Sequence, residues 1–143
     1  MYQFKLAHRA LIAVLLTLMA PFFVASAVAQ QSQTLEVVIG DEDAPVTVIE
    51  YMSLTCGHCA NFHINTLPEV MKNYVDTGKV RIIFRDYPLD GTAYQAAIAT
   101  HCMAEAGSKR YYGFVQILFQ QQQRWATAPD PLAEVAKLAR IGG

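Results

Sequence analysis

Apolar and polar positions alternate along the chain in patterns that predict a mixed α/β fold. The runs Val46–Met52 and Lys79–Arg85 are short and almost continuously apolar, which is typical of strands buried on both faces of a sheet. A shorter β-branched run, Leu35–Ile39, predicts one more strand. Between the two longer runs, the sequence predicts a helix from Cys56 to about Asp76, which Pro68 should kink. Strand, helix and strand together indicate a βαβ unit, right-handed by default.

The chain beyond this unit is predicted to be helical. An Ala-rich helix is expected from Thr92 or Ala93 to Ala106, where Gly107 ends it. Arg110–Arg124 carries apolar residues at helical spacing, and a last short helix is expected over Pro131–Ile141.

The first 29 residues have the pattern of an export signal. Lys5 and Arg9 form a basic start, an apolar stretch follows over Ala10–Val24, and Ala27-Val28-Ala29 supplies the small residues that a signal peptidase reads. We therefore expect a signal peptide, residues 1–29, that is cleaved after Ala29. An uncleaved membrane anchor is the alternative, because this stretch is about as long as the ~20 residues that a span needs.

The net charge and the expected export narrow the range of functions that the sequence supports. Without the signal peptide, the remaining 114 residues carry 9 basic and 12 acidic side chains, a net charge of −3. This balance lacks the basic surface of a nucleic-acid-binding protein, so no nucleic-acid partner is expected. Export, in turn, would place the cysteines in an oxidising compartment, where a pair of them can cycle as a disulfide.

The run Thr55-Cys56-Gly57-His58-Cys59 is the strongest chemical signal in the chain. A Cys-x-x-Cys pair in the first turn of a helix has both sulfurs on one face, close enough to bridge. The helix N-terminus favours the thiolate form through its unpaired N–H groups and its partial positive charge. Cys56 is then the outer nucleophile or leaving group, and Cys59 is the buried resolving thiol. His58 between them is expected to stabilise the Cys56 thiolate, which favours an oxidising disulfide.

Other chemistries fit the same motif. Cys-x-x-Cys is also half of a zinc site, for which His63, His101 and Cys102 are the candidate completing ligands, although they form no second paired motif. An inert structural disulfide and a chaperone-like module without turnover are further alternatives. His63 is expected on the helix surface, in a solvated or packing role. The redox interpretation is preferred, and it requires neither a cofactor nor a metal.

Several segments together resemble the DsbA-like oxidoreductases of the thioredoxin superfamily. The similarity runs through Ala44–His63, Leu67-Pro68 and Val80–Gly91, and it covers most of residues 36–141. The resemblance implies a thioredoxin-like half with the Cys-x-x-Cys motif over residues 30–92 and the start of an inserted helical domain over residues 93–143. It also implies a periplasmic enzyme that donates its disulfide to folding secreted proteins with free thiols, and a membrane-bound, quinone-linked partner that reoxidises it.

Glu50 gains a role from this resemblance. It stands six residues before Cys56, where DsbA-like proteins carry a buried acid beneath the active site. A carboxylate enclosed in an apolar strand carries a costly charge, which suits it to relay a proton to or from Cys59. The alternative is an ion pair within the sheet, with Lys79 as the partner.

The chain also departs from the family pattern. DsbA has proline where this chain has Gly57, and Cys-Gly-His-Cys is the motif of protein disulfide isomerase, so an isomerase or reductase with the same site stays open. None of the prolines fits the family's cis-proline loop, and the cis-proline half of the fold is absent from the sequence. We interpret the chain as C-terminally truncated, which leaves a sheet edge open.

Cys102 is the third cysteine and has two interpretations. It is either a buried free thiol that faces the core near Ile98, or half of a second, structural disulfide. Some DsbA-like proteins have such a disulfide, and here the second half would lie beyond residue 143.

Overall fold

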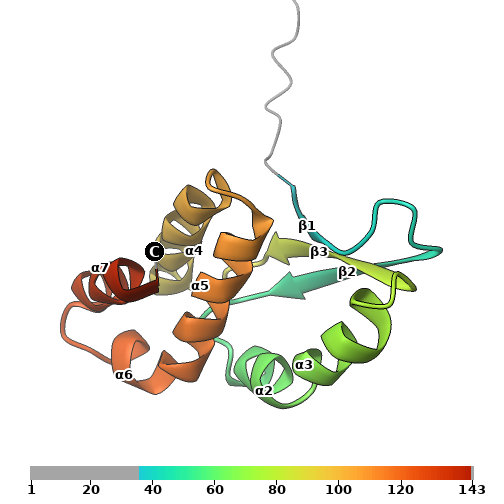
Figure 1. Ribbon diagram of the computed structural model, residues 1–143. Coiled ribbons are helices and arrows are strands. Elements are labelled where there is room, and N and C mark those ends of the chain that lie inside the picture. Colours follow the sequence, from blue (N-terminus) through green and yellow to red (C-terminus); the bar gives the residue numbers. More distant parts are fainter. Residues whose placement is uncertain (1–35, 143) are drawn as a thin grey trace, which may run out of the picture. The chain divides into compact units, whose positions relative to one another are not determined.

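The computed structural model describes residues 36–142, so the predicted signal peptide, residues 1–29, lies outside the described residues. Within this range every peptide bond is trans, and no helix has the length and apolar character needed to cross a bilayer. The described residues form one sheet of three strands and a set of helices (Figure 1). The strands are β1 (Val37–Ile39), β2 (Val46–Met52) and β3 (Val80–Asp86).

The strand β3 is the centre of the sheet, whose order is β1-β3-β2. It pairs antiparallel with β1 and parallel with β2, in a register that places Val46 beside Val80 and Met52 beside Asp86. Three successive residues of β3, 82–84, are buried, as expected of a strand covered on both faces. The parallel pair confirms the predicted strand–helix–strand unit.

The strand β2 was predicted to be buried on both faces, and that prediction is wrong. Val46, Val48, Ile49 and Tyr51 are all exposed. Among the described residues β2 pairs with β3 alone, so its other edge is open. Its apolar pattern matches a central strand, but burial depends on neighbours that lie on both sides of a strand.

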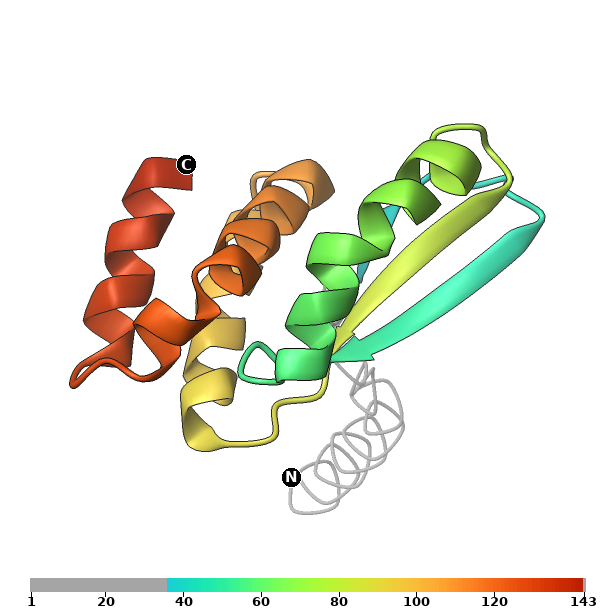
Figure 2. The same ribbon diagram turned by 90° about the horizontal axis from the view of Figure 1, so that it is seen from below.

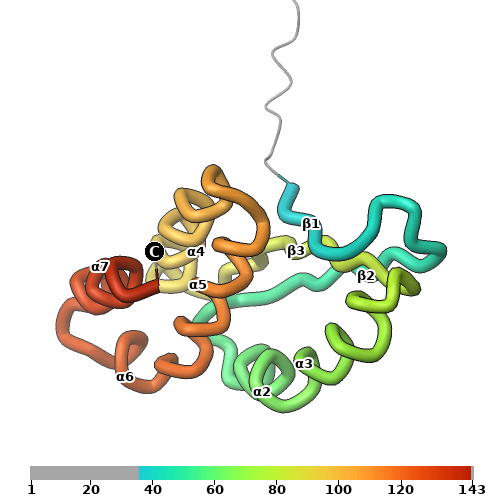
Figure 3. Tube along the Cα trace, viewed as in Figure 1, coloured from blue at the N-terminus to red at the C-terminus, as the bar shows by residue number. Residues whose placement is uncertain are grey.

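The segment after β2 was predicted to be one kinked helix, and it forms three short helical pieces. These are α2 (Gly57–Asn65), α3 (Leu67–Val70) and the π-helical turn η2 (Met71–Val75), joined as the trace in Figure 3 shows. The break lies at Thr66, whose N–H still bonds to Phe62 O at 2.9 Å. Pro68 falls in the first turn of α3, where its missing N–H costs nothing, whereas a continuous helix would bring its ring against the carbonyl of Ile64.

Four helices follow β3: α4 (Gly91–Ala104), α5 (Ser108–Gln120), α6 (Gln122–Ala126) and α7 (Pro131–Gly142). The first and last agree with the predicted helices to within a few residues. The predicted helix Arg110–Arg124 is instead two helices separated at Gln121. The reason is tertiary, because the side chain of Gln122 turns inward to bond to the loop after β2.

The helix α5 lies between the sheet with α2 and the helices α4 and α7. It packs against α2 and β1 on one side and against α4 and α7 on the other (Figures 1 and 2). Figure 2 shows α2 and α3 lying along one face of β2 and β3. The buried side chains of α5 form the middle of a continuous core: Tyr111, Phe114, Val115, Leu118 and Phe119.

We expect Gly40→Ala to destabilise the fold. Gly40 has φ of +113°, and a Cβ placed there would lie 2.7 Å from Val80 O and 2.8 Å from Arg81 Cα, both of them backbone atoms. The strained backbone and the clash should lower the free energy of unfolding by about 2 kcal/mol or more, measured by urea denaturation.

The matched control is Gly113→Ala. A Cβ at Gly113, within α5, meets nothing within 4 Å. Because alanine loses less backbone entropy than glycine in a helix, this change should raise the free energy of unfolding by about 0.5–1 kcal/mol. Equal effects of the two substitutions would contradict the assigned backbone at Gly40.

Candidate active site

The Cys-x-x-Cys motif lies at the N-terminus of α2, directly after the carboxyl end of β2. Ser53 and Leu54 are buried, and the N–H of Cys56 donates to Ser53 O at 3.0 Å to close a tight turn. Cys56 is the N-cap of α2, with extended backbone, and its Sγ accepts the N–H of Cys59 at 3.4 Å. A cysteine side chain therefore occupies the place where serine or aspartate usually caps a helix.

The two cysteines have opposite electrostatic environments. A hydrogen bond from the Cys59 thiol, followed by backbone N–H groups of Cys59 and His58, lowers the pKa of the Cys56 thiol. Burial raises the pKa of the Cys59 thiol, and the charges of Cys56 and Glu50 raise it further. Both are free thiols here, so this is the dithiol state. The arrangement makes Cys56 the better thiolate and leaving group and keeps Cys59 protonated.

His58 is exposed, and in the described part of the chain no hydrogen bond joins its ring to Cys56. It contributes to the Cys56 thiolate through its backbone N–H. Stabilisation by its side chain stays a prediction.

A second loop holds the active-site loop in place. Thr55 Oγ1 donates to Asp90 Oδ2 at 2.6 Å, and Asp90 Oδ1 accepts the N–H of Ala93 at 2.7 Å as the N-cap of α4. The N–H of Leu89 donates to Ser53 Oγ at 3.3 Å. The bond from Thr55 is the main reason that the pKa of Asp90 is lowered. Asp90 was not among the predicted site residues, although an aspartate just before a predicted helix is a capping signal.

Gln122 fixes the same loop from the other side. It is buried, and its Nε2 donates to Leu54 O at 2.9 Å and to Cys56 O at 3.0 Å. Its two partners are carbonyl groups of the loop that carries the first cysteine. It lies in the run of glutamines 120–123, where no local pattern distinguishes it.

Glu50 and His63 form a pair behind the motif, with His63 fully buried and Glu50 mostly buried. Glu50 Oε1 lies 2.8 Å from His63 Nε2, and the His63 side chain is fully buried. The prediction of His63 on the helix surface is therefore wrong, and so is the alternative in which Lys79 is the ion-pair partner of Glu50. Lys79 is exposed in the turn before β3. The reason is that α2 packs on the face of β2 that carries Glu50.

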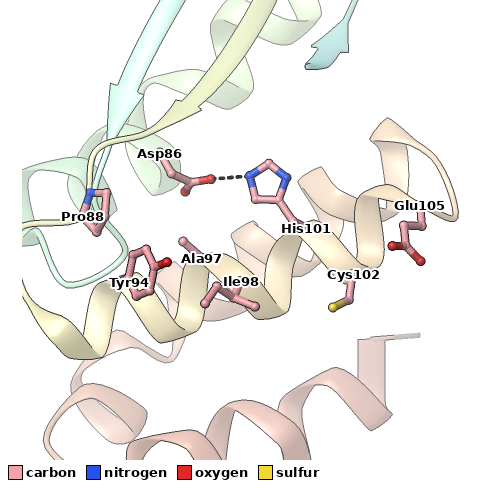
Figure 4. A pocket seen from close by; sticks show the side chains of 8 residues that line it. All are labelled: Asp86, Pro88, Tyr94, Ala97, Ile98, His101, Cys102 and Glu105. Carbon is pink, nitrogen blue, oxygen red and sulfur yellow. Dashed lines mark hydrogen bonds and ion pairs between the residues drawn. The ribbon is translucent and has the colours of Figure 1, made fainter. Parts of the chain in front are cut away.

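Cys102 is exposed, so the prediction of a thiol facing the core is wrong. It lines a pocket of about 490 Å³ along α4 together with Ile98, which is itself exposed (Figure 4). On the same helix His101 turns toward β3, where its Nε2 lies 2.8 Å from Asp86 Oδ2. Burial raises the pKa of Asp86, an effect that the bond from His101 opposes.

The residues proposed for a zinc site are not brought together. His63 is bound to Glu50, and His101 is bound to Asp86. Within residues 36–142, no three side chains of histidine, cysteine, aspartate or glutamate are placed to hold a metal ion.

Comparisons with known proteins agree on one family. A family model described as thioredoxin matches residues 32–141. A Rickettsia prowazekii protein, provisionally named as a protein-disulfide oxidoreductase, is 32% identical over 108 residues, 76% of this chain and 39% of that protein. Disulfide bond formation protein D of Bacillus subtilis is 31% identical over 105 residues, 70% of this chain and 47% of that protein. The crystal structure of Wolbachia pipientis α-DsbA1 matches with a TM-score of 0.66 and 36% identity, covering 74% of this chain and 54% of that one.

The chain belongs to the thioredoxin family, and within it to the DsbA-like proteins. The predicted thioredoxin-like α/β fold is confirmed. The chain spans about two fifths to half of the length of the curated relatives named above.

Gln122→Leu should loosen the active-site loop. The change leaves the carbonyls of Leu54 and Cys56 without their donor, which should lower the free energy of unfolding by about 1–3 kcal/mol in urea denaturation. Gln123→Leu is the control, because Gln123 is exposed and its side chain makes no hydrogen bond among the described residues. The same loss in both variants would contradict the role of Gln122.

Iodoacetamide should alkylate Cys56 before Cys59 in the reduced protein. The lowered pKa of Cys56 keeps its thiolate present at pH values below the ordinary thiol value of 9.0, whereas the raised pKa of Cys59 keeps that thiol protonated there. The difference in rate should therefore be largest near neutral pH and shrink as the pH rises. Peptide mass spectrometry measures both rates, with exposed Cys102 as the internal reference; faster alkylation of Cys59 would overturn the assignment.

Proposed function

We propose that the protein is an exported thiol–disulfide oxidoreductase that transfers a disulfide from Cys56 and Cys59 to cysteines of folding secreted proteins. The observation that carries this proposal is the opposite shift of the two thiols at one helix N-terminus, a lowered pKa at Cys56 and a raised pKa at Cys59. A low-pKa outer thiolate stabilises the dithiol form, and a stable dithiol form makes the disulfide an oxidant.

The reaction consists of two exchanges. A substrate thiolate attacks Cys56 Sγ of the disulfide form, the Cys56–Cys59 bond breaks, and Cys59 leaves as a thiolate that takes up a proton. A second substrate thiolate then attacks the substrate sulfur of the mixed disulfide, and Cys56 leaves as a thiolate. The substrate thereby gains a disulfide and loses two electrons, which the protein keeps as its two thiols.

Glu50 is proposed as the group that exchanges the proton with Cys59. Its carboxylate is mostly buried beside α2, and its charge contributes to the raised pKa of Cys59. A buried carboxyl group near a thiol that must gain and lose a proton is suited to that transfer. His58 next to Cys56 is proposed to stabilise the outer thiolate.

The location and the partners of the protein are proposed from the sequence. The basic start, apolar stretch and small residues within positions 1–29 support export to the periplasm by a cleaved signal peptide. Reoxidation requires an acceptor for two electrons, and we propose the membrane-bound, quinone-linked protein that DsbA-like proteins imply. A groove of about 460 Å³ beside Gly57, between α2 and the α5–α6 turn, is a candidate contact surface for substrate chains.

Oxidative refolding of a reduced substrate protein tests the proposed function. The oxidised chain should accelerate refolding, and Cys56→Ser and Cys59→Ser should each abolish this effect. Cys59→Ser should also accumulate mixed disulfides through Cys56, because the resolving thiol is gone. Cys102→Ser is the matched control and should keep full activity.

Two results would contradict these roles. One is activity that survives Cys56→Ser, and the other is an oxidised wild-type chain that transfers no disulfide. Equilibration with glutathione measures the reduction potential of the Cys56–Cys59 pair, and this value distinguishes an oxidase from an isomerase or a reductase.

A further inference from the structure

The Glu50–His63 pair has a third member on another helix. Gln116 of α5 presents its side-chain NH₂ group to His63 Nδ1 at a distance of 3.2 Å. Gln116 is half-buried, and it approaches the ring from the side opposite to Glu50. The three side chains come from β2, α2 and α5, which are separated in sequence and brought together by the fold.

The amide of Gln116 faces Nδ1 and, together with the Glu50 carboxylate at Nε2, favours the His63 tautomer that carries its hydrogen on Nε2. An amide NH₂ group only donates, so Nδ1 must accept and cannot carry a hydrogen. The proton of the neutral imidazole is then on Nε2, which donates to Glu50 Oε1 at 2.8 Å. The ring packs between aromatic side chains: its centroid lies 4.3 Å from that of Phe119 and 6.0 Å from that of Phe84.

The two oxygens of Glu50 are consequently not equivalent. Oε1 accepts a hydrogen bond that suits a carboxylate, whereas Oε2 is buried and has no hydrogen-bond partner among the described residues. A proton on this carboxyl group is therefore best carried by Oε2, since Oε1 already accepts from His63. Leaving one buried oxygen without a partner costs free energy, and a functional role is one reason why a protein retains such a group.

We propose that His63 is a positioning residue that holds Glu50 through Oε1 and reserves Oε2 for proton exchange with Cys59, and that Gln116 sets the tautomer of His63 for this task. The proposal rests on the proposed function of Glu50 and deepens it. When Cys59 leaves as a thiolate, the proton on Glu50 Oε2 moves to Cys59 Sγ, and the new carboxylate keeps its bond from His63. In the reverse exchange the proton returns to Oε2.

Other titratable groups also face Glu50 and respond to its charge. Cys59 of α2 is one, and Tyr111 and Tyr112 of α5 are the others; burial is the main cause of the raised pKa of each, and the charge of Glu50 adds to it. From β3 the neighbour of the His63 ring is Phe84, which does not titrate. Both tyrosines stay neutral over the acid range in which a carboxyl group titrates, so they do not contribute to the pH dependence of glutathione release in that range.

The test measures how Cys59 resolves a mixed disulfide between Cys56 and glutathione, as a function of pH. Glutathione release is followed by acid quenching and mass spectrometry of the full chain. Cys59 must give up its proton in this step and Glu50 must be free to accept it, so the rate should fall as the pH is lowered. His63→Phe keeps the ring packing but removes the donor to Oε1. Because the carboxylate then loses a charge-assisted hydrogen bond, the low-pH part of the pH–rate profile (the acid limb) should move to higher pH by about one unit. At a given pH on that limb, glutathione release should then be about tenfold slower.

Two further variants test the direction in which the acid limb moves. His63→Gln supplies an amide donor to Glu50 and should restore the wild-type profile to within about twofold. Gln116→Glu places a carboxylate against Nδ1, which favours a doubly protonated, positively charged ring. Since a positive ring stabilises the Glu50 carboxylate, the acid limb should move to lower pH, opposite to His63→Phe.

The tautomer is measured directly by nitrogen NMR of labelled histidine in the wild-type chain. The proposal expects a hydrogen on Nε2 and none on Nδ1, and the opposite result would overturn it. It would also be overturned if His63→Phe, shown to be folded by urea denaturation, kept the wild-type acid limb. If His63→Phe fails to fold, Gln116→Leu takes its place, and an unchanged tautomer in that variant would exclude the role of Gln116.

Failure of the proposed function gives a different result. A wild-type chain that never releases glutathione would contradict the exchange chemistry of Cys56 and Cys59, while the tautomer of His63 would still be measurable. In a Glu50→Gln background the His63→Phe change should leave the pH profile unaltered. A further shift in that double variant would mean that His63 does not act through Glu50.

Discussion

The parallel pairing of β2 with β3 is the constraint on which the rest of the site depends. The register places Met52 beside Asp86, so the loops that follow the two strands begin at the same edge of the sheet. The N–H of Tyr87 donates to Met52 O at 2.7 Å, and Thr55 bonds to Asp90 one loop away. The turn that carries Cys56 is therefore held by a neighbouring loop as well as by its own helix. Carboxyl edges of parallel strands are common places for functional loops because such loops converge there.

The helical part of the chain also contributes to the site. Through α5 and α6 it supplies Gln116 to the ring of His63 and Gln122 to the carbonyls of the active-site loop. Phe119 of α5 packs against the same histidine. Buried polar groups are stable only where their partners are held in place, and here those partners come from helices that lie more than fifty residues further along the chain. The helical segment thus stabilises the geometry that the two cysteines require.

The chemistry rests on an asymmetry between two identical side chains. Cys56 caps the helix and receives hydrogen bonds, which favour its thiolate. Cys59 lies one turn inside, where burial opposes ionisation and the charge of Glu50 adds to that effect. One helical turn is enough to separate the two environments, because the first N–H groups of a helix are free to donate and those further in are not. The buried acid behind the second cysteine connects this local asymmetry to the sheet.

The features that the sequence predicted correctly are the local ones. The Cys-x-x-Cys motif at a helix start, the strand–helix–strand order and the helix beginning at Pro131 follow from neighbouring residues, so pattern and spacing were enough to find them. Three of the wrong predictions concern which side of an element is covered; the others concern the continuity of two helices and the partner of Glu50. An open edge exposes β2 despite its apolar pattern, α2 turns His63 inward onto Glu50, and Cys102 faces a surface pocket. These outcomes depend on which elements pack together, and burial of a face is a property of the neighbouring element as much as of the face itself.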